Sequence, residues 1–90
     1  MTELHDDTAR HRLEMAEQGH TVFADYRRSG GRLIIDHVEA PDALRGTGAA
    51  GRFMEALVAH ARAKGERITP ICSYAAAWLQ RHPDEAKDVV

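Results

Sequence analysis

Residues 40–50 bring Arg45, Gly46 and Gly48 to the expected start of a helix. The first N–H groups of a helix have no partner within it, and the helix dipole is positive at that end. Such a loop is typical of a seat for a phosphate or pyrophosphate group. The apolar run 33–38 precedes the loop and can supply an extended edge for the rest of a long ligand. The segment therefore predicts a strand, a phosphate-binding loop and a helix.

Two other site types fit the sequence less well. Residues 46–51 match the glycine spacing of dinucleotide-binding loops, but those glycines open a doubly wound sheet, and here a run of hairpin-connected strands precedes them. The histidines lack the spacing of a zinc site, and Cys72, the single cysteine, cannot complete a thiolate site. We expect no metal site.

Length and charge narrow the class of protein. Ninety residues suit one domain spanning 1–90, and 12 basic against 14 acidic residues give a net charge of −2. This balance argues against nucleic-acid binding, which depends on neutralising phosphates. No apolar run is long enough to span a membrane, and the acidic N-terminus is unlike a signal peptide. We expect a cytoplasmic protein that binds neither nucleic acid nor membrane, as a monomer or weak homo-oligomer.

The first half of the chain predicts three antiparallel strands. Residues 1–11 are polar and expected to be partly loose. Alternation of apolar and charged residues predicts a strand at 12–17, and strand formers fill 21–28. Gly30 and Gly31 favour a hairpin turn before the most apolar strand, 32–38.

In the second half of the chain the spacing of the apolar residues changes from that of strands to that of a helix. Apolar residues at steps of three and four predict a helix over 49–64, which Gly65 ends. A short strand at 67–72 follows and is expected to lie parallel to strand 32–38. A second helix over 74–81 and a last turn at 84–87 complete the chain. The predicted fold class is α/β (α+β), in the order β-β-β-α-β-α.

The loop resembles a known family signature. Residues 45–50 match R-x-x-G-x-G/A, the coenzyme A motif of the GCN5-related N-acetyltransferases. Segments 37–48, 70–74 (Pro-Ile-Cys-Ser-Tyr) and 82–83 (His-Pro) resemble the small single-domain YjdJ-like or NATD1-like subfamily of that superfamily. The resemblance covers nearly the whole chain. It implies a minimal acetyltransferase fold with an antiparallel meander and a splayed parallel strand pair at the cofactor site.

The resemblance also implies a coenzyme site. The pyrophosphate turn would be lined mostly through backbone N–H groups, and the pantetheine arm would lie between the splayed strands 37–40 and 68–72. One free backbone donor there would polarise the thioester carbonyl. The residues implied at the coenzyme are Val38, Glu39, Ala40, Arg45, Gly46, Thr47, Gly48, Ala49, Ala50, Cys72 and Tyr74.

Two departures from the family pattern bear on the acceptor. Pro41 lies one residue farther from Arg45 than is typical, so the loop is expected to be longer. Typical members have one or two helices after the first strand, and here Gly19 alone is expected to replace them. The acceptor side should therefore be open to a large acceptor, such as a protein or peptide amine, or be completed by a partner chain.

Four residues are candidates for catalysis, each with a structural alternative. Glu39 and His37 share a strand face and either could act as the base; otherwise they are solvated or capping groups. Cys72 precedes a helix that would activate its thiol, or it is a small buried apolar residue. Tyr74 would give a proton to the leaving thiolate, as a tyrosine does in many superfamily members.

The favoured function is acetyl transfer from acetyl-CoA to an unidentified amine, by direct attack in a ternary complex. The alternative is a module that binds coenzyme A or acyl-CoA with little catalysis and acts through a protein partner.

Overall fold

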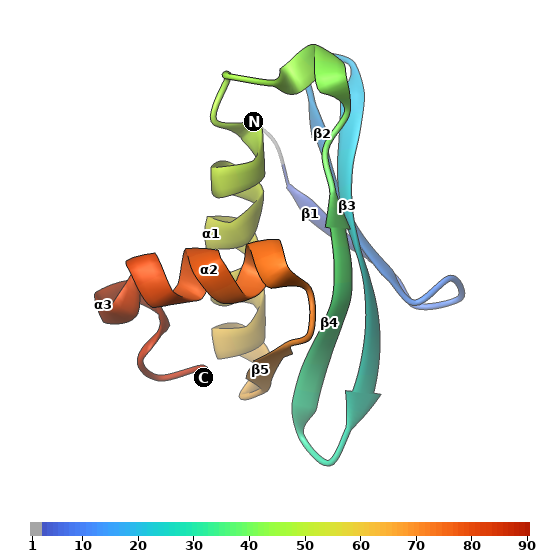
Figure 1. Cartoon of the computed structure of the whole chain (residues 1–90). Coiled ribbons are helices and arrows are strands. Elements are labelled where there is room, and N and C mark those ends of the chain that lie inside the picture. The colour runs from blue at the N-terminus through green and yellow to red at the C-terminus, as the bar shows by residue number, and fades with distance from the viewer. Residues whose placement is uncertain (1–2) are drawn as a thin grey trace.

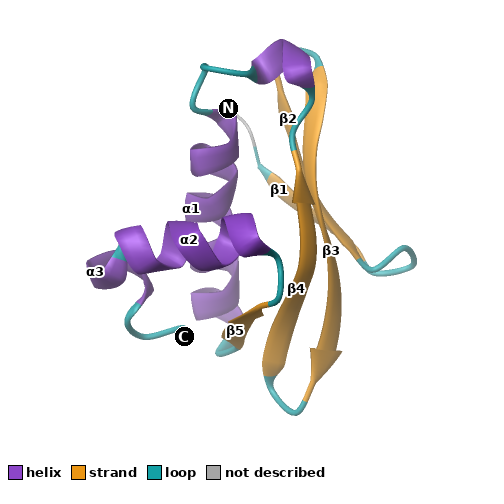
Figure 2. Ribbon diagram, viewed as in Figure 1, coloured by secondary structure: helices purple, strands orange, loops and turns teal. Residues whose placement is uncertain are grey.

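One five-stranded mixed sheet, with its helices on a single face, forms the molecule (Figures 1 and 2). The computed structural model describes residues 3–90. The strands, which lie side by side in chain order, are β1 (Leu4–Asp7), β2 (Arg12–Glu17), β3 (His20–Ser29), β4 (Arg32–Glu39) and β5 (Arg67–Pro70). The helical segments are the 3₁₀ turn η1 (Asp42–Leu44), α1 (Ala49–Lys64), α2 (Ser73–Arg81) and α3 (Pro83–Ala86).

The predicted meander, long helix and parallel crossover are confirmed. β2, β3 and β4 pair antiparallel, while β5 pairs parallel with β4. α1 has the predicted bounds, and Gly65 ends it in the left-handed conformation with φ 68°. β5 stops at Pro70, two residues before the predicted end at 72, because the chain turns there into α2.

The expectation that residues 1–11 are loose is wrong for the described part of that segment. Leu4–Asp7 forms β1 and pairs antiparallel with β2, from Leu4 opposite Met15 to Asp7 opposite Arg12. Residues 1 and 2 lie outside the described part of the chain. The element order therefore has one more strand than predicted. The polar sequence of β1 hides this strand, which depends on partners distant in the chain.

The expected role of Gly19 is also wrong. Gly19 lies in the tight turn between β2 and β3, with φ 78°. The connection that follows the first strand is the turn at residues 8–11, where the N–H groups of Arg10 and His11 bond to the carbonyls of Asp7 and Thr8. A short turn, and no helix, follows the first strand.

A β-bulge in β4 reverses the inward and outward positions of its last residues. Leu33 and Ile35 are fully buried, and strict alternation from them would turn residues 37 and 39 toward the helices. The pairing with β3 shifts between Asp25 and Tyr26, which leaves Asp36 as the extra residue. After the bulge Val38 contacts the core instead.

The core lies between the sheet and α1 with α2. Phe53, Met54 and Leu57 of the predicted α1 stripe are fully buried, as is Leu13 on β2. Trp78 of α2 is 4% exposed and belongs to the same core. Within residues 3–90, no helix has the length and apolar character needed to cross a bilayer.

Candidate coenzyme and acceptor site

The loop between β4 and α1 is built by two glycines and a short 3₁₀ turn. Gly46 and Gly48 have φ values of 80° and 81°, a conformation that L side chains rarely adopt. Leu44 of η1 is 3% exposed and anchors the loop in the core. The Leu44 N–H closes this turn by bonding to the Pro41 carbonyl at 2.9 Å.

Part of the loop backbone is already hydrogen bonded. The N–H groups of Arg45 and Thr47 bond to the carbonyls of Asp42 and Leu44, and the Ala49 N–H bonds to Thr47 Oγ1 at 3.3 Å. Within residues 3–90, no partner exists for four N–H groups at the start of α1, those of Gly46, Gly48, Ala50 and Gly51. These four are the donors that an anion would meet.

The free donors border a pocket of about 350 Å³. Its walls come from the end of β4, η1, the first turn of α1 and the start of α2. The predicted site residues that line it are Ala40, Arg45, Gly46, Gly48, Ala49, Ala50 and Tyr74. Sequence reasoning missed Pro41, Asp42, Leu44 and Gly51 as lining residues. Gly51 carried a signal, since a glycine in the first turn of a helix leaves room above the free N–H groups.

β4 and β5 separate beside this pocket. Their pairing ends at Ile35 opposite Pro70, and from Asp36 to Glu39 β4 has only β3 as a neighbouring strand. The chain leaving β5 stays close, because the N–H groups of Ile71 and Cys72 both bond to the Ile35 carbonyl at 3.0 Å. The start of α2 therefore lies beside the end of β4 that β5 does not reach (Figure 1).

Four of the predicted coenzyme residues come from the two segments that separate here, and of these Ala40 and Tyr74 line the pocket while Val38 and Cys72 do not. Val38 and Ala40 from β4 and its end, and Cys72 and Tyr74 from the start of α2, are partly buried and contact the core. Burial raises the pKa of the Tyr74 phenol above its ordinary value. Like any phenol, Tyr74 is protonated at neutral pH and so holds a proton that it can donate.

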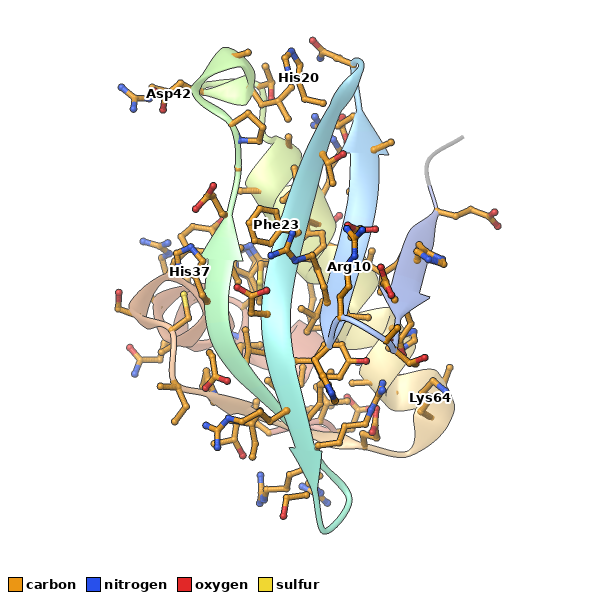
Figure 3. All side chains as sticks on the ribbon, turned by 90° about the vertical axis from the view of Figure 1, so that its right-hand side faces the viewer. Arg10, His20, Phe23, His37, Asp42 and Lys64 are labelled. Carbon is orange, nitrogen blue, oxygen red and sulfur yellow. The ribbon has the colours of Figure 1, made fainter. Side chains whose placement is uncertain are left out.

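His37 and Glu39 lie elsewhere. Their side chains are 53% and 59% exposed, and His37 Nε2 is 3.1 Å from Glu39 Oε1, which confirms that they share a face. That face is the one turned away from the helices, where the His37 ring meets Phe23 edge to face (Figure 3). The structure thus brings Tyr74 and the loop together, and places the two base candidates on the other side of the sheet.

The chain matches known proteins both in sequence and in fold. Residues 10–89 match the family described as GCN5-related N-acetyl-transferase. The chain belongs to this family. A GCN5-like protein from Staphylococcus aureus, solved by NMR, is 24% identical, with a TM-score of 0.73 over 97% of this chain and 85% of that one, and this likeness shows the fold. A comparison with curated proteins gives no match.

The loop of this GCN5-related chain fits the coenzyme that the family implies. The four free N–H groups and the glycine turn suit a pyrophosphate, and the first turn of α1 holds no acidic residue that would repel it. Arg45 bonds to Asp42 at 3.1 Å, with both side chains largely exposed, so its guanidinium can move toward a bound anion. Among residues 3–90, no group of three His, Cys, Asp or Glu side chains is placed to hold a metal ion.

Proposed function

We propose that this chain transfers an acetyl group from acetyl-CoA to an amine acceptor by direct attack in a ternary complex. Family membership supports acetyl transfer as the general reaction. The observation that carries the finer proposal is the shared pocket of Tyr74 and the free N–H groups of the loop. When bound there, the coenzyme would supply the acetyl thioester.

The residues of the chain have separate tasks in this proposal. The N–H groups of Gly46, Gly48 and Ala50 hold the pyrophosphate, and the separated strands β4 and β5 direct the pantetheine arm past Cys72. Tyr74 holds a proton beside the departing thiolate, because a phenol is protonated at neutral pH. Glu39, alone or with His37, accepts the amine proton from the outer face.

The acceptor side is open in this proposal. The turn at 8–11 takes the place of helices after the first strand, so Phe23, His37 and Glu39 are reached from solvent across the outer face (Figure 3). A protein or peptide amine is therefore the acceptor class that we propose.

One observation favours the alternative of a coenzyme-binding module. His37 and Glu39 do not line the pocket that Tyr74 shares with the loop. If an acceptor amine cannot reach both the thioester and Glu39, binding without efficient transfer results.

Titration and turnover together test the proposal. Saturable binding of acetyl-CoA in a calorimeter, with thiol release that depends on an added peptide amine, would support the enzyme. Glu39→Gln should then lower kcat and leave the Kd for acetyl-CoA unchanged. Binding without acceptor-dependent thiol release would support the module. Absence of binding would contradict both.

A further inference from the structure

Arg52 is placed beside the loop by a partner far away in the chain. Arg52 lies one turn into α1, and its side chain meets Glu17 at the end of β2. Its Nε and Nη2 both donate to Glu17 Oε1, at 2.9 and 2.6 Å. The Glu17 side chain is 13% exposed, so the acceptor is held in place by its surroundings. The guanidinium orientation is thereby set.

This orientation aims the remaining nitrogen at the glycine turn. Within residues 3–90, Nη1 of Arg52 donates no hydrogen bond. A methyl group placed on the α-carbon of Gly48 would lie 3.1 Å from Nη1. Residues 48 and 52 are neighbours on one helix face, and helical side chains lean toward the N-terminus. Nη1 therefore lies beside Gly48, which lines the loop pocket, while the Arg52 side chain itself borders the separate hollow of about 450 Å³ that Glu17 also lines.

We propose that Arg52 is a pyrophosphate ligand of the coenzyme, held ready for it by Glu17. A charged donor already fixed in orientation loses little entropy on binding, and charge-assisted hydrogen bonds to phosphate are among the strongest. The backbone N–H groups supply the shape of the anion site, and Arg52 adds a cationic donor, Nη1, that its pairing with Glu17 leaves free. This inference rests on the proposed binding of acetyl-CoA.

The test compares two arginines of the same helix. Arg52 and Arg62 have side chains of equal exposure, 46%, and each is paired with an acid, Arg62 with Asp88 at 2.6 Å. Arg62 lies at the other end of α1. Calorimetric Kd values for CoA and for dephospho-CoA are measured with the wild type, Arg52→Ala and Arg62→Ala, with thermal unfolding of each variant as a check on folding.

We expect Arg52→Ala to weaken the binding of CoA and of dephospho-CoA by the same factor, about tenfold. Arg62→Ala should bind both as the wild type does. Glu17→Gln keeps an acceptor oxygen for Arg52 and should also retain the wild-type affinity.

Other outcomes overturn the inference. Wild-type CoA affinity in Arg52→Ala would remove Arg52 from the site, and a loss for CoA but not dephospho-CoA would place it at the 3′-phosphate instead. An equal loss in Arg62→Ala would show that helix stability, and not a contact with the coenzyme, is responsible. A wild-type protein that does not bind CoA would overturn the proposed function, and this inference with it.

Discussion

Gly48 is the residue on which the coenzyme site depends most directly. It caps α1 with φ 81°, it offers a free N–H to the pocket, and a Cβ added to it would lie 3.1 Å from Arg52 Nη1. Any side chain at this position meets both a strained backbone and a crowded guanidinium. Both the left-handed backbone and the nearby guanidinium of Arg52 therefore require a residue without a Cβ at position 48.

We expect Gly48→Asp to abolish CoA binding in calorimetry, because the carboxylate would repel the pyrophosphate and the Cβ would displace Arg52. Gly65→Asp is the matched control. Gly65 has a similar φ of 68°, nothing lies within 4 Å of its added Cβ, and it is at the far end of α1. Both variants should lose about 1–2 kcal/mol of stability from the left-handed backbone. Retained CoA affinity in Gly48→Asp would contradict the placement of the site.

Tyr74 allows a second test at the scale of one residue. Its half-buried phenol, with a raised pKa, lines the same pocket as the loop. If it protonates the leaving thiolate, Tyr74→Phe should lower kcat roughly 100-fold. The Kd for acetyl-CoA should change little, because the ring remains. A variant with wild-type kcat would show that the proton comes from elsewhere.

At the scale of elements, β1 is tied to the rest of the molecule by a cluster of charged side chains. Asp6 on β1 accepts the Tyr26 hydroxyl at 2.5 Å and pairs with Arg28 at 3.0 Å. Arg28 also bonds to Glu66 at 2.7 Å, and His60 of α1 lies 3.7 Å from Asp6. The cluster joins β1, β3, α1 and the turn after α1. This explains why a polar segment forms a strand.

Removing the Asp6 carboxylate should therefore destabilise the protein. We expect Asp6→Ala to lower the free energy of unfolding by about 2 kcal/mol, because Tyr26 and Arg28 lose a largely buried acceptor. Asp36→Ala is the control: it removes an ion pair with Arg27 whose side chains are 34% and 62% exposed. Exposed pairs contribute about 0–1 kcal/mol. Urea denaturation of both variants measures the difference, and equal losses would contradict the role of the cluster.

At the scale of the whole molecule, the same cluster sets the pH range of stability. Burial lowers the pKa of His60 below 6.5, so the unfolded chain takes up a proton first as the pH falls below that value. Burial and the bond to Asp6 raise the pKa of Tyr26 from 10.0 to about 12, so the unfolded chain loses its proton first above pH 10. The lowered pKa of His60 favours unfolding at low pH, and the raised pKa of Tyr26 favours unfolding at high pH.

We therefore expect urea midpoints to be highest between about pH 7 and 10, and to fall on both sides. Below pH 3.8 a further loss follows, since hydrogen bonds from Tyr26 and Arg28 outweigh the burial of Asp6 and lower its pKa. Tyr26→Phe should be less stable at pH 8 but should lose less stability between pH 10 and 12. If Tyr26→Phe loses as much stability between pH 10 and 12 as the wild type does, groups other than Tyr26 cause that loss.

The sequence by itself determined the features that depend on near neighbours. The spacing of Phe53, Met54 and Leu57 predicted α1, and Gly65 predicted its end, because helix periodicity and capping act within a few residues. The arginine and glycines of the loop predicted a phosphate-binding turn for the same reason. The parallel crossover to β5 also followed, since a helix of this length permits it.

Only the tertiary structure decided the features that join distant segments. β1 forms because Asp6 contacts Tyr26 and Arg28, which lie 20 and 22 residues away and share no local pattern with it. The bulge at Asp36 depends on pairing between β3 and β4, and it turns His37 away from the helices. Arg52 meets Glu17 across 35 residues. Side-chain contacts between separate elements leave no periodic pattern in the sequence. The loop could therefore be predicted from the sequence, whereas the side chains that surround it could not.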